Sequence, residues 1–268
     1  MIPDDLRTAV RHVFRQPVVT AQQLHGGDLS DVSLLTLEDG QSLVSKSGPL
    51  TAVESRMLLA IAQTGARSPQ VLGSYGPHLF LEALPEAAPT PAGWRDLGHS
   101  LGKLHGTTGA HFGWQDDYAF GSVPIRNTPE TSWHEFWGEN RLRALSKGVP
   151  DDLRKRLDVL IERLPELLPD PPKALLHGDL WVGNAVFTPR HAFLIDPACY
   201  FGDPEVDLAM LHLFARPPDA FWEGYGRPAA GWQQRMPVYQ LWPALVHLCL
   251  FGAGYVGMVD SRLTSLGV

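Results

Sequence analysis

The spacing of hydrophobic positions predicts where a first helix ends and strands begin. Leu6, Val10 and Val13 recur three or four residues apart, as on one face of a helix, and predict a helix over residues 3–15. The stretch 18–47 is rich in β-branched residues and contains Glu-Asp-Gly, which is a hairpin signal. It predicts two or three antiparallel strands.

A second helix and a further pair of strands follow. Residues 51–64 are strongly helical in pattern, with Thr51 as the candidate N-cap and Gly65 as the stop signal. Residues 69–85, PQVLGSYGPHLFLEALP, predict two more short strands. We therefore expect residues 1–83 to form a small antiparallel sheet with one central helix.

The rest of the chain is predicted to be mainly helical, with two short strands among the helices. Residues 84–93 belong to a Pro/Ala-rich stretch that is typical of a joint between lobes. The predicted helices cover residues 94–108, 132–146, 150–168, 204–215 and 232–258. The sequence thus predicts an α+β protein with a small lobe of residues 1–83, a linker of 84–93 and a larger lobe of 94–268.

Composition and charge exclude several classes of protein. With 268 residues, 44% of them hydrophobic, the chain is long enough for two lobes with a substantial core. The formal net charge of -7 argues against a nucleic-acid binder, which needs a basic face. The most apolar stretch, 238–258, is interrupted by Pro243 and Gly252, so we expect no membrane span. The N-terminal residues lack the apolar segment of a signal peptide, and we expect a cytoplasmic monomer.

Metal sites built from cysteine or histidine are not expected. Cys199 and Cys249 lie far apart in the sequence and form no CxxC motif. The 11 histidines show no HExxH spacing. Zinc and a disulfide scaffold are therefore both disfavoured.

Polar residues between apolar flanks mark the candidate chemistry. In LLHGDLWVGNAVF, residues 175–187, Asp179 and Asn184 stand five positions apart, and Asp196 follows the apolar residues 193–195. An aspartate can accept a proton from a hydroxyl, while amide and carboxylate oxygens are ligands that Mg²⁺ prefers. The order Asp, Asn, Asp is the one used in kinase-type phosphoryl transfer.

The small lobe offers the cation that such a reaction needs. Lys46 ends the strand-like SLVSK and could meet phosphates, and Glu54, eight residues on, could hold the lysine in place. The segment 25–30, HGGDLS, is a candidate loop over the phosphates. Each feature also has an ordinary interpretation, namely a solvated lysine and a glycine turn.

Other conspicuous residues are interpreted as structural. His177 is expected to hydrogen-bond the backbone and hold its loop, since Asp179 already occupies the position of the base. Asp207 is expected to brace the start of a helix through backbone N–H groups. The tryptophans are expected to pack in the core or between the lobes, with Trp222 and Tyr225 as candidate exceptions.

Five motifs, taken together, resemble those of the fructosamine kinase (ketosamine-3-kinase) family, within the aminoglycoside-phosphotransferase and protein-kinase-like group. The resemblance runs from about residue 17 to residue 257, nearly the whole chain. It implies a bilobal protein-kinase-like fold and a kinase that uses ATP and Mg²⁺. The motifs are LLHGDLWVGN, IDPACYFGDPEVDLAM, LFARPPDAFWEGY, FGWQDDYAFG and WHEFWGENRL.

The resemblance also implies a role for each matching residue. Asp179 would be the catalytic base, Asn184 and Asp196 the Mg²⁺ ligands. Lys46 would bind phosphate with Glu54 as its partner. The backbone of Glu82, Ala83 and Leu84 would contact adenine, and Trp181 would lie near the sugar. Trp222 and Tyr225 fall near the expected acceptor region.

The chain departs from the family pattern on the acceptor side. Val182 stands where the family usually has serine, and Ala215 and Arg216 stand where it usually has Gly-Gly. Ser45 precedes the lysine in place of the usual valine. The first two departures concern the identity of the acceptor more than the chemistry.

The expected function is transfer of the ATP γ-phosphoryl group to a sugar hydroxyl of a fructosamine or ribulosamine, free or on protein lysines. In the family, phosphorylation of the 3-hydroxyl makes the adduct unstable and releases the amine, which implies a repair enzyme. One alternative is a kinase of the same fold for an aminoglycoside, a choline-like alcohol or a free sugar. A second is a non-catalytic pseudokinase, which normally lacks the lysine, the base or the metal-binding aspartate.

Overall fold

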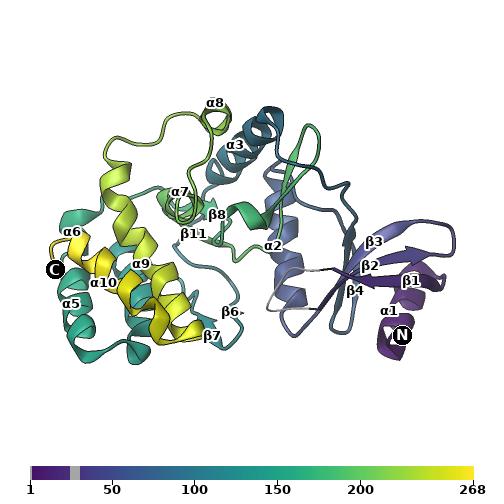
Figure 1. Ribbon diagram of the computed structural model, residues 1–268, viewed down its shortest axis with the longest axis horizontal. Helices are drawn as coiled ribbons and strands as arrows, with labels where there is room; N and C mark the ends of the chain where they lie inside the picture. Colours follow the sequence, from purple (N-terminus) through teal and green to yellow (C-terminus); the bar gives the residue numbers. More distant parts are fainter. Residues whose placement is uncertain (1, 25–30) are drawn as a thin grey trace.

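Five antiparallel strands form a sheet in the N-terminal part of the chain, in the order β1-β2-β3-β5-β4 (Figure 1). The structure, a computed structural model, describes residues 2–24 and 31–268. The β2–β3 hairpin turns at Gly40, where Glu-Asp-Gly predicted it. The elements of this part are α1 (Asp4–Phe14), β1 (Val18–Gln23), β2 (Asp31–Leu37), β3 (Ser42–Ser47), α2 (Thr51–Gln63), β4 (Val71–Tyr75) and β5 (His78–Glu82).

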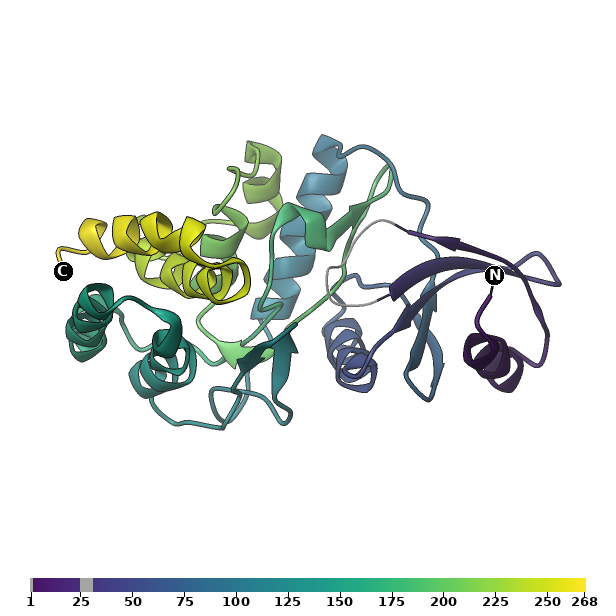
Figure 2. The same cartoon turned by 60° about the horizontal axis from the view of Figure 1, so that its bottom comes forward.

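Two helices cover opposite faces of this sheet (Figure 2). Val10 of α1 belongs to the same buried cluster as Phe80 of β5. Leu58 of α2 belongs to a second cluster with Leu79 and Leu81 of the same strand. Because neighbouring side chains of a strand point to opposite faces, an uninterrupted apolar run in β5 meets both helices.

The C-terminal part is mainly helical and carries three two-stranded sheets, so the α+β class is confirmed. Its first helix begins at Pro91, three residues before the predicted start, because the Thr90 side chain accepts a hydrogen bond from the Gly93 amide at 3.0 Å. The elements are α3 (Pro91–His105), β6 (Tyr118–Phe120), β7 (Val123–Ile125), α4 (Trp133–Glu135), η1 (Phe136–Leu142), η2 (Arg143–Gly148), α5 (Asp151–Glu162), α6 (Leu164–Leu167), β8 (Ala174–Leu176), η3 (Val182–Asn184), β9 (Ala185–Phe187), β10 (Ala192–Leu194), β11 (Tyr200–Gly202), α7 (Glu205–Leu211), α8 (Asp219–Tyr225), α9 (Trp232–Phe251), η4 (Ala253–Tyr255) and α10 (Val256–Ser265).

Several predicted boundaries were wrong for local reasons. Thr51 is the first residue of α2 and not its N-cap; its hydroxyl donates to the carbonyls of Gly48 and Pro77, both at 3.1 Å. The helix predicted over 232–258 is broken at Gly252, whose φ of 80° leaves the helical region. The seven-residue helix α8 was not predicted.

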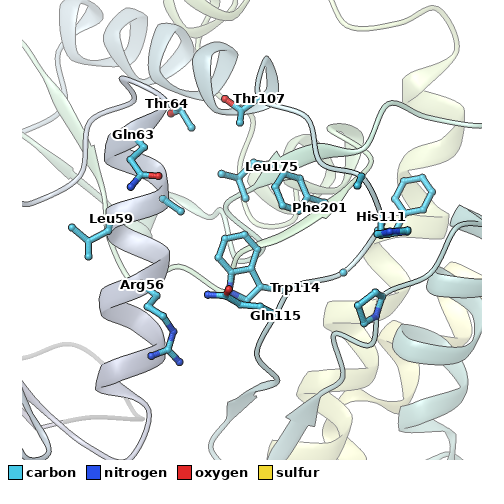
Figure 3. Close-up of a pocket in the computed structure, with 15 residues that line it drawn as sticks. Arg56, Leu59, Gln63, Thr64, Thr107, His111, Trp114, Gln115, Leu175 and Phe201 are labelled. Atoms are coloured by element: carbon cyan, nitrogen blue, oxygen red, sulfur yellow. The ribbon is translucent and has the colours of Figure 1, made fainter.

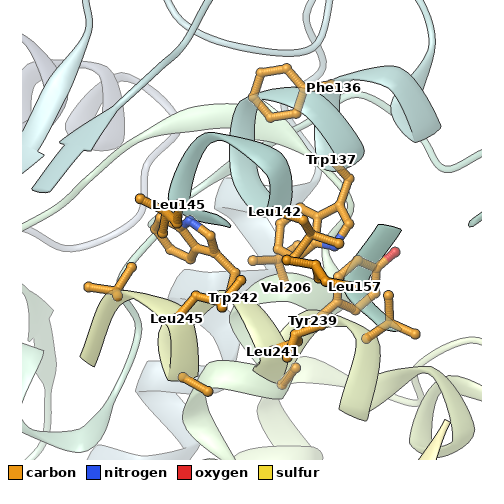
Figure 4. Close-up of a cluster of buried hydrophobic side chains, with 14 of the residues drawn as sticks. Phe136, Trp137, Leu142, Leu145, Leu157, Val206, Tyr239, Leu241, Trp242 and Leu245 are labelled. Carbon is orange, nitrogen blue, oxygen red and sulfur yellow. The ribbon is translucent and has the colours of Figure 1, made fainter. Parts of the chain in front are cut away.

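A group of large aromatic residues packs among aliphatic side chains in the core of the larger lobe (Figure 4). Trp133, Trp137 and Tyr239 are fully buried, and their rings are tilted or meet edge to face at centroid separations of 5.0–6.3 Å. Trp242 joins them from α9, at 6.4 Å from Trp137. The prediction that these tryptophans pack in the core is confirmed.

A buried arginine lies among these rings. Arg141 is 0% exposed and its guanidinium lies over the rings of Phe136 and Tyr200, at 4.6 and 4.1 Å from their centroids. It donates to the Arg126 carbonyl and, at 2.8 Å, to Oδ1 of Asn127. Phe136 and Arg141 stand five residues apart in the π-helix η1, whose i→i+5 turn brings them to one face.

None of the helices in the described part of the chain is both long enough and apolar enough to cross a bilayer.

Replacing Arg141 should test how much this buried cation stabilises the larger lobe. We expect Arg141→Met to lower the free energy of unfolding by about 2–4 kcal/mol, because the variant loses cation–π contacts and leaves the buried Oδ1 of Asn127 without its donor. The measurement is urea unfolding followed by tryptophan fluorescence.

The matched control is Arg143→Met, which removes a more exposed arginine paired with Glu139 and Asp158. Exposed ion pairs contribute little, so we expect a loss below about 1 kcal/mol. Equal losses in the two variants would contradict a special role for Arg141.

Candidate active site

Two short strand pairs hold the loop that contains the predicted catalytic residues. β8 pairs with β11, and β9 pairs with β10, so the loop between β8 and β9 is anchored at both ends. The Ala198 amide donates to the His177 carbonyl at 2.8 Å, and the Ile195 amide donates to the Asn184 carbonyl at 3.0 Å. These bonds join the loop to the segment that carries Asp196.

The backbone at position 178 accepts only glycine. Its φ is 82°, and a Cβ atom there would lie 2.0 Å from the Ala198 carbonyl oxygen. No other residue type fits without moving the backbone, so the chain direction just before Asp179 is fixed.

His177 has the structural role that was expected of it. Its Nε2 donates to the Ile195 carbonyl at 2.9 Å, and its Nδ1 accepts from the Asp179 amide at 3.3 Å. Burial lowers the pKa of His177, which favours the neutral ring that this pair of bonds requires.

Asp207 accepts from backbone N–H groups, as predicted, but these belong to the catalytic loop and not to the start of a helix. It lies inside α7, is 0% exposed, and accepts from the amides of His177 and Gly178 at 2.8 and 2.9 Å. His105 of α3 donates to it from Nε2 at 3.0 Å, and the Tyr225 hydroxyl meets Nδ1 of the same ring at 2.9 Å. Burial alone would raise the pKa of Asp207, but the donors that face it hold it below its usual range.

Asp179 and Asn184 are hydrogen-bonded to each other. Nδ2 of Asn184 donates to the main-chain oxygen of Asp179 at 2.8 Å and to its Oδ2 at 2.9 Å. This leaves the carbonyl Oδ1 of Asn184 as the amide atom that can bind a cation. Burial raises the pKa of Asp179 to about 7 against the opposing hydrogen bond from Asn184, and the charge of Asp196 adds to the rise. A carboxylate with a pKa near neutrality is suited to general-base catalysis.

Lys46 joins the two lobes. Its Nζ lies 2.5 Å from Oε1 of Glu54 on α2 and 2.6 Å from Oδ1 of Asp196, and only 5% of the residue is exposed. Burial alone would lower the pKa of Lys46, but the two carboxylates outweigh it and raise the pKa above its usual range. The sequence-based pairing of Lys46 with Glu54 is therefore found in the structure.

Asp196 adopts an unusual backbone conformation. It is one of two non-glycine residues with positive φ, at 53°, in the part of the chain that the structure describes. Such strain is stored where the surroundings over-determine it, often at functional sites. Its side chain is 36% exposed, so Oδ2 stays available beyond the bond to Lys46.

The donor set fits a hard divalent cation. Oδ1 of Asn184 and the carboxylate of Asp196 supply oxygen ligands, and Mg²⁺ usually takes one or two carboxylates together with substrate phosphates and water. Within residues 2–24 and 31–268, no three His, Cys, Asp or Glu side chains gather in a metal-binding cluster. A cation held here would therefore need ligands from the substrate and water.

The predicted adenine-binding residues follow β5. The Glu82 amide donates to Gln70 at 2.9 Å, and the Leu84 carbonyl accepts from Glu86 at 2.9 Å. Among the described residues, the Leu84 amide has no hydrogen-bond partner and remains a free donor. Ala83 lies between them and is half-buried.

The three predicted acceptor residues differ in their surroundings. Trp181 is 38% exposed on the catalytic loop. Trp222 packs against His212 and Trp232 at centroid separations of 5.6 and 5.4 Å, and Tyr225 is bonded to His105. Trp222 thus packs against other rings, and Tyr225 supports the His105–Asp207 pair. The predicted phosphate loop, 25–30, lies outside the described residues.

Two residues were missed by the sequence analysis. Burial raises the pKa of Tyr118, and the charges of Glu54, Asp196 and Asp179 add to the rise. Its motif, FGWQDDYAFG, was noticed without a residue being singled out. His105 was missed because its partner, Asp207, is 102 residues away.

A pocket of about 700 Å³ opens between α2 and residues 107–115 (Figure 3). Arg56, Leu59 and Gln63 line it from α2 and lie on the opposite face from Glu54, given 3.6 residues per turn. None of the predicted site residues lines this pocket. It is separate from the charged group around Lys46.

The raised pKa of Asp179 predicts a stability difference that depends on pH. The folded state binds the proton more tightly than the unfolded state, whose carboxyl titrates near pH 4, so the parent loses stability as pH rises from about 4 through about 7. Asp179→Asn carries no such charge. We expect the stability of the variant relative to the parent to rise over this pH range. At pH 8 in EDTA the variant should be about 1–3 kcal/mol more stable, a figure reduced to allow for the partial exposure of Asp179 to solvent.

The measurement is urea unfolding of both proteins between pH 4 and pH 8. Asp170→Asn, at a side chain that is 91% exposed, is the control and should show no such trend. A difference between Asp179→Asn and the parent that is independent of pH would contradict the raised pKa.

Comparison with known proteins identifies the family. The chain matches the fructosamine kinase family over residues 6–266. It is 41% identical over 200 residues to a Synechocystis protein named as a probable ketoamine kinase, covering 69% of this chain and 66% of that one. It is 34% identical over 188 residues to the chloroplastic protein-ribulosamine 3-kinase of Arabidopsis thaliana, covering 64% and 57%. These alignments span less than two thirds of either relative.

The fold agrees with this family over its full length. The crystal structure of a candidate fructosamine-3-kinase from Thermobifida fusca superposes with a TM-score of 0.89 at 31% sequence identity, covering 97% of each chain. The bilobal kinase-like fold is thus confirmed, and the chain belongs to the fructosamine kinase family.

Proposed function

We propose that the protein is an ATP- and Mg²⁺-dependent kinase that phosphorylates a sugar hydroxyl of a ketosamine. The observation that supports this most is the ion pair of Lys46 with Glu54 and Asp196, which sets the phosphate-binding cation of one lobe against the acids of the other. The names of the two relatives, a ketoamine kinase and a ribulosamine kinase, supply the acceptor class.

Nucleotide binding is assigned to the small lobe and the linker. We take residues 1–83 as the ATP-binding lobe, 84–93 as the hinge and 94–268 as the lobe for catalysis and the acceptor. The backbone from Glu82 to Leu84 would hold adenine, with the free Leu84 amide as a donor. Lys46 would hold the phosphates, oriented by Glu54.

The catalytic loop would act on the acceptor. Asp179 would orient the acceptor hydroxyl and take its proton, which its pKa of about 7 allows at neutral pH. Asn184 and Asp196 would hold the Mg²⁺, which would neutralise charge on the transferring phosphoryl group. Positioning and electrostatics, with little covalent chemistry by the protein, would supply the acceleration.

The substrate would be a fructosamine or ribulosamine, free or on a protein, and the product would release the amine. Such an enzyme repairs glycated amines. We take the protein to act as a monomer in the cytoplasm. The pseudokinase alternative is disfavoured because the lysine, the base and the metal-binding aspartate are all present.

A panel of acceptors tests the substrate class. We expect ATP turnover with fructoselysine or ribuloselysine, with the phosphate on the sugar as located by NMR, and much weaker turnover with aminoglycosides, choline or free sugars. Asp179→Ala should lower kcat by about 10²–10⁴, as for loss of a general base. Turnover with aminoglycosides alone would overturn the proposal. A background rate of Mg·ATP hydrolysis that is the same in Asp179→Ala as in the parent would favour the pseudokinase.

The ion pair can be tested separately. Lys46→Met should lower kcat/KM for ATP by about 10²–10³, comparable to the loss of one preorganised donor to developing charge. Glu54→Gln should cause a smaller loss of kcat/KM, because the lysine is still present and only the carboxylate that positions it is removed. Lys155→Met, at an exposed lysine on α5, is the control and should match the parent in a coupled ADP-release assay.

A further inference from the structure

Several exposed aromatic side chains lie beside the catalytic loop. Phe214 and Phe251 are 56% and 55% exposed, and Trp181 is 38% exposed. Burial of such rings is strongly favourable, so a group of them left in water marks a surface that binds something.

These rings form one continuous strip with His247 and Tyr255. Trp181 lies 6.0 Å from Phe214 and Phe214 lies 6.1 Å from His247, between ring centroids. His247 then lies 5.6 Å from Phe251 and 5.1 Å from Tyr255. We call these five residues the aromatic strip.

The strip brings together distant parts of the sequence. Trp181 comes from the catalytic loop, Phe214 from the segment after α7, His247 and Phe251 from the end of α9, and Tyr255 from η4. It begins at Trp181, two residues beyond Asp179 on the catalytic loop. The strip therefore starts on the loop to which the proposed function assigns the acceptor hydroxyl.

The charge of this surface favours a cation. Residues 241–259 contain no Asp, Glu, Lys or Arg. The faces of aromatic rings are negative, and α9 ends at Phe251, so its unpaired carbonyls give this end a partial negative charge. Nδ1 of His247 donates to the Pro243 carbonyl at 2.7 Å, which fixes that ring in the strip.

A second aromatic cluster lies apart from the strip. The His212 ring packs on Trp222 and Trp232, at 5.6 and 5.1 Å, and not on the strip. A cation on the strip would meet ring faces and the carbonyls at the end of α9.

We propose that the aromatic strip binds the protonated amine of the ketosamine and the alkyl side chain that carries it, so that the enzyme prefers adducts on lysine side chains to adducts on small amines. The inference rests on the proposed function, because it concerns the part of the same substrate that lies beyond the sugar. A ketosamine nitrogen is a secondary amine that is protonated at neutral pH, and on a protein it continues into the methylene chain of lysine. Cation–π contact suits the first and apolar contact the second.

The test compares two substrates that share the sugar and differ in the amine. One is the fructosamine of methylamine, and the other is the fructosamine on the side chain of Nα-acetyl-lysine methylamide. We expect kcat/KM to favour the lysine-borne substrate in the parent. Phe214→Ala and Phe251→Ala should each reduce this preference about threefold, and the double variant about tenfold.

Three controls keep the result specific. Val159→Ala, at a side chain that is 48% exposed on α5, should keep the parental preference. Phe251→Leu retains apolar bulk without an aromatic face and should give an intermediate value. Thermal unfolding of each variant excludes loss of the fold.

The outcomes separate the hypotheses. An active parent whose preference is unchanged in the double variant overturns the inference and leaves the proposed function intact. A parent that phosphorylates neither fructosamine overturns both. If analytical ultracentrifugation shows a dimer that the double variant dissolves, with the preference unchanged, a second copy of the chain covers the strip and the inference is wrong.

Discussion

The charged contact between the lobes is the interaction on which the rest of the site depends. Lys46 lies on β3, Glu54 lies on α2 and Asp196 follows β10. The ammonium group of Lys46 therefore connects three parts of the fold. The desolvation of this lysine is offset by two carboxylates, and removing either would leave the charge poorly compensated. The sheet, the helix beneath it and the loop of the larger lobe must therefore all be in place together for the site to exist.

Much of this could be predicted from the sequence because the signals are local. Lys46 and Glu54 are eight residues apart on adjacent elements, and Asp179 and Asn184 share one short loop. The partners of Asp207 were predicted wrongly because they are the amides of a loop about 30 residues away, which leave no trace in the pattern around it. Contacts of that kind depend on tertiary packing, which periodicity does not encode.

The same distinction holds for the fold. Long periodic segments such as α2, α5 and α9 were predicted, whereas the three-residue strands β6 and β7 and the short helix α8 carry too few residues to show a period. The π-helical turn of η1 was missed because its cause is the placement of Phe136 and Arg141 against the aromatic core. That core supports β11 through Tyr200 and so reaches the catalytic loop.

The pairing of Lys46 with two carboxylates also affects how an anionic ligand could bind. Its positive charge is already neutralised by two acids, and Asp179 adds a third carboxyl nearby. A polyphosphate that approached alone would meet excess negative charge and would have to compete with internal counter-ions for the lysine. Under the proposed function, a nucleotide is therefore expected to bind more favourably when it carries its own metal cation.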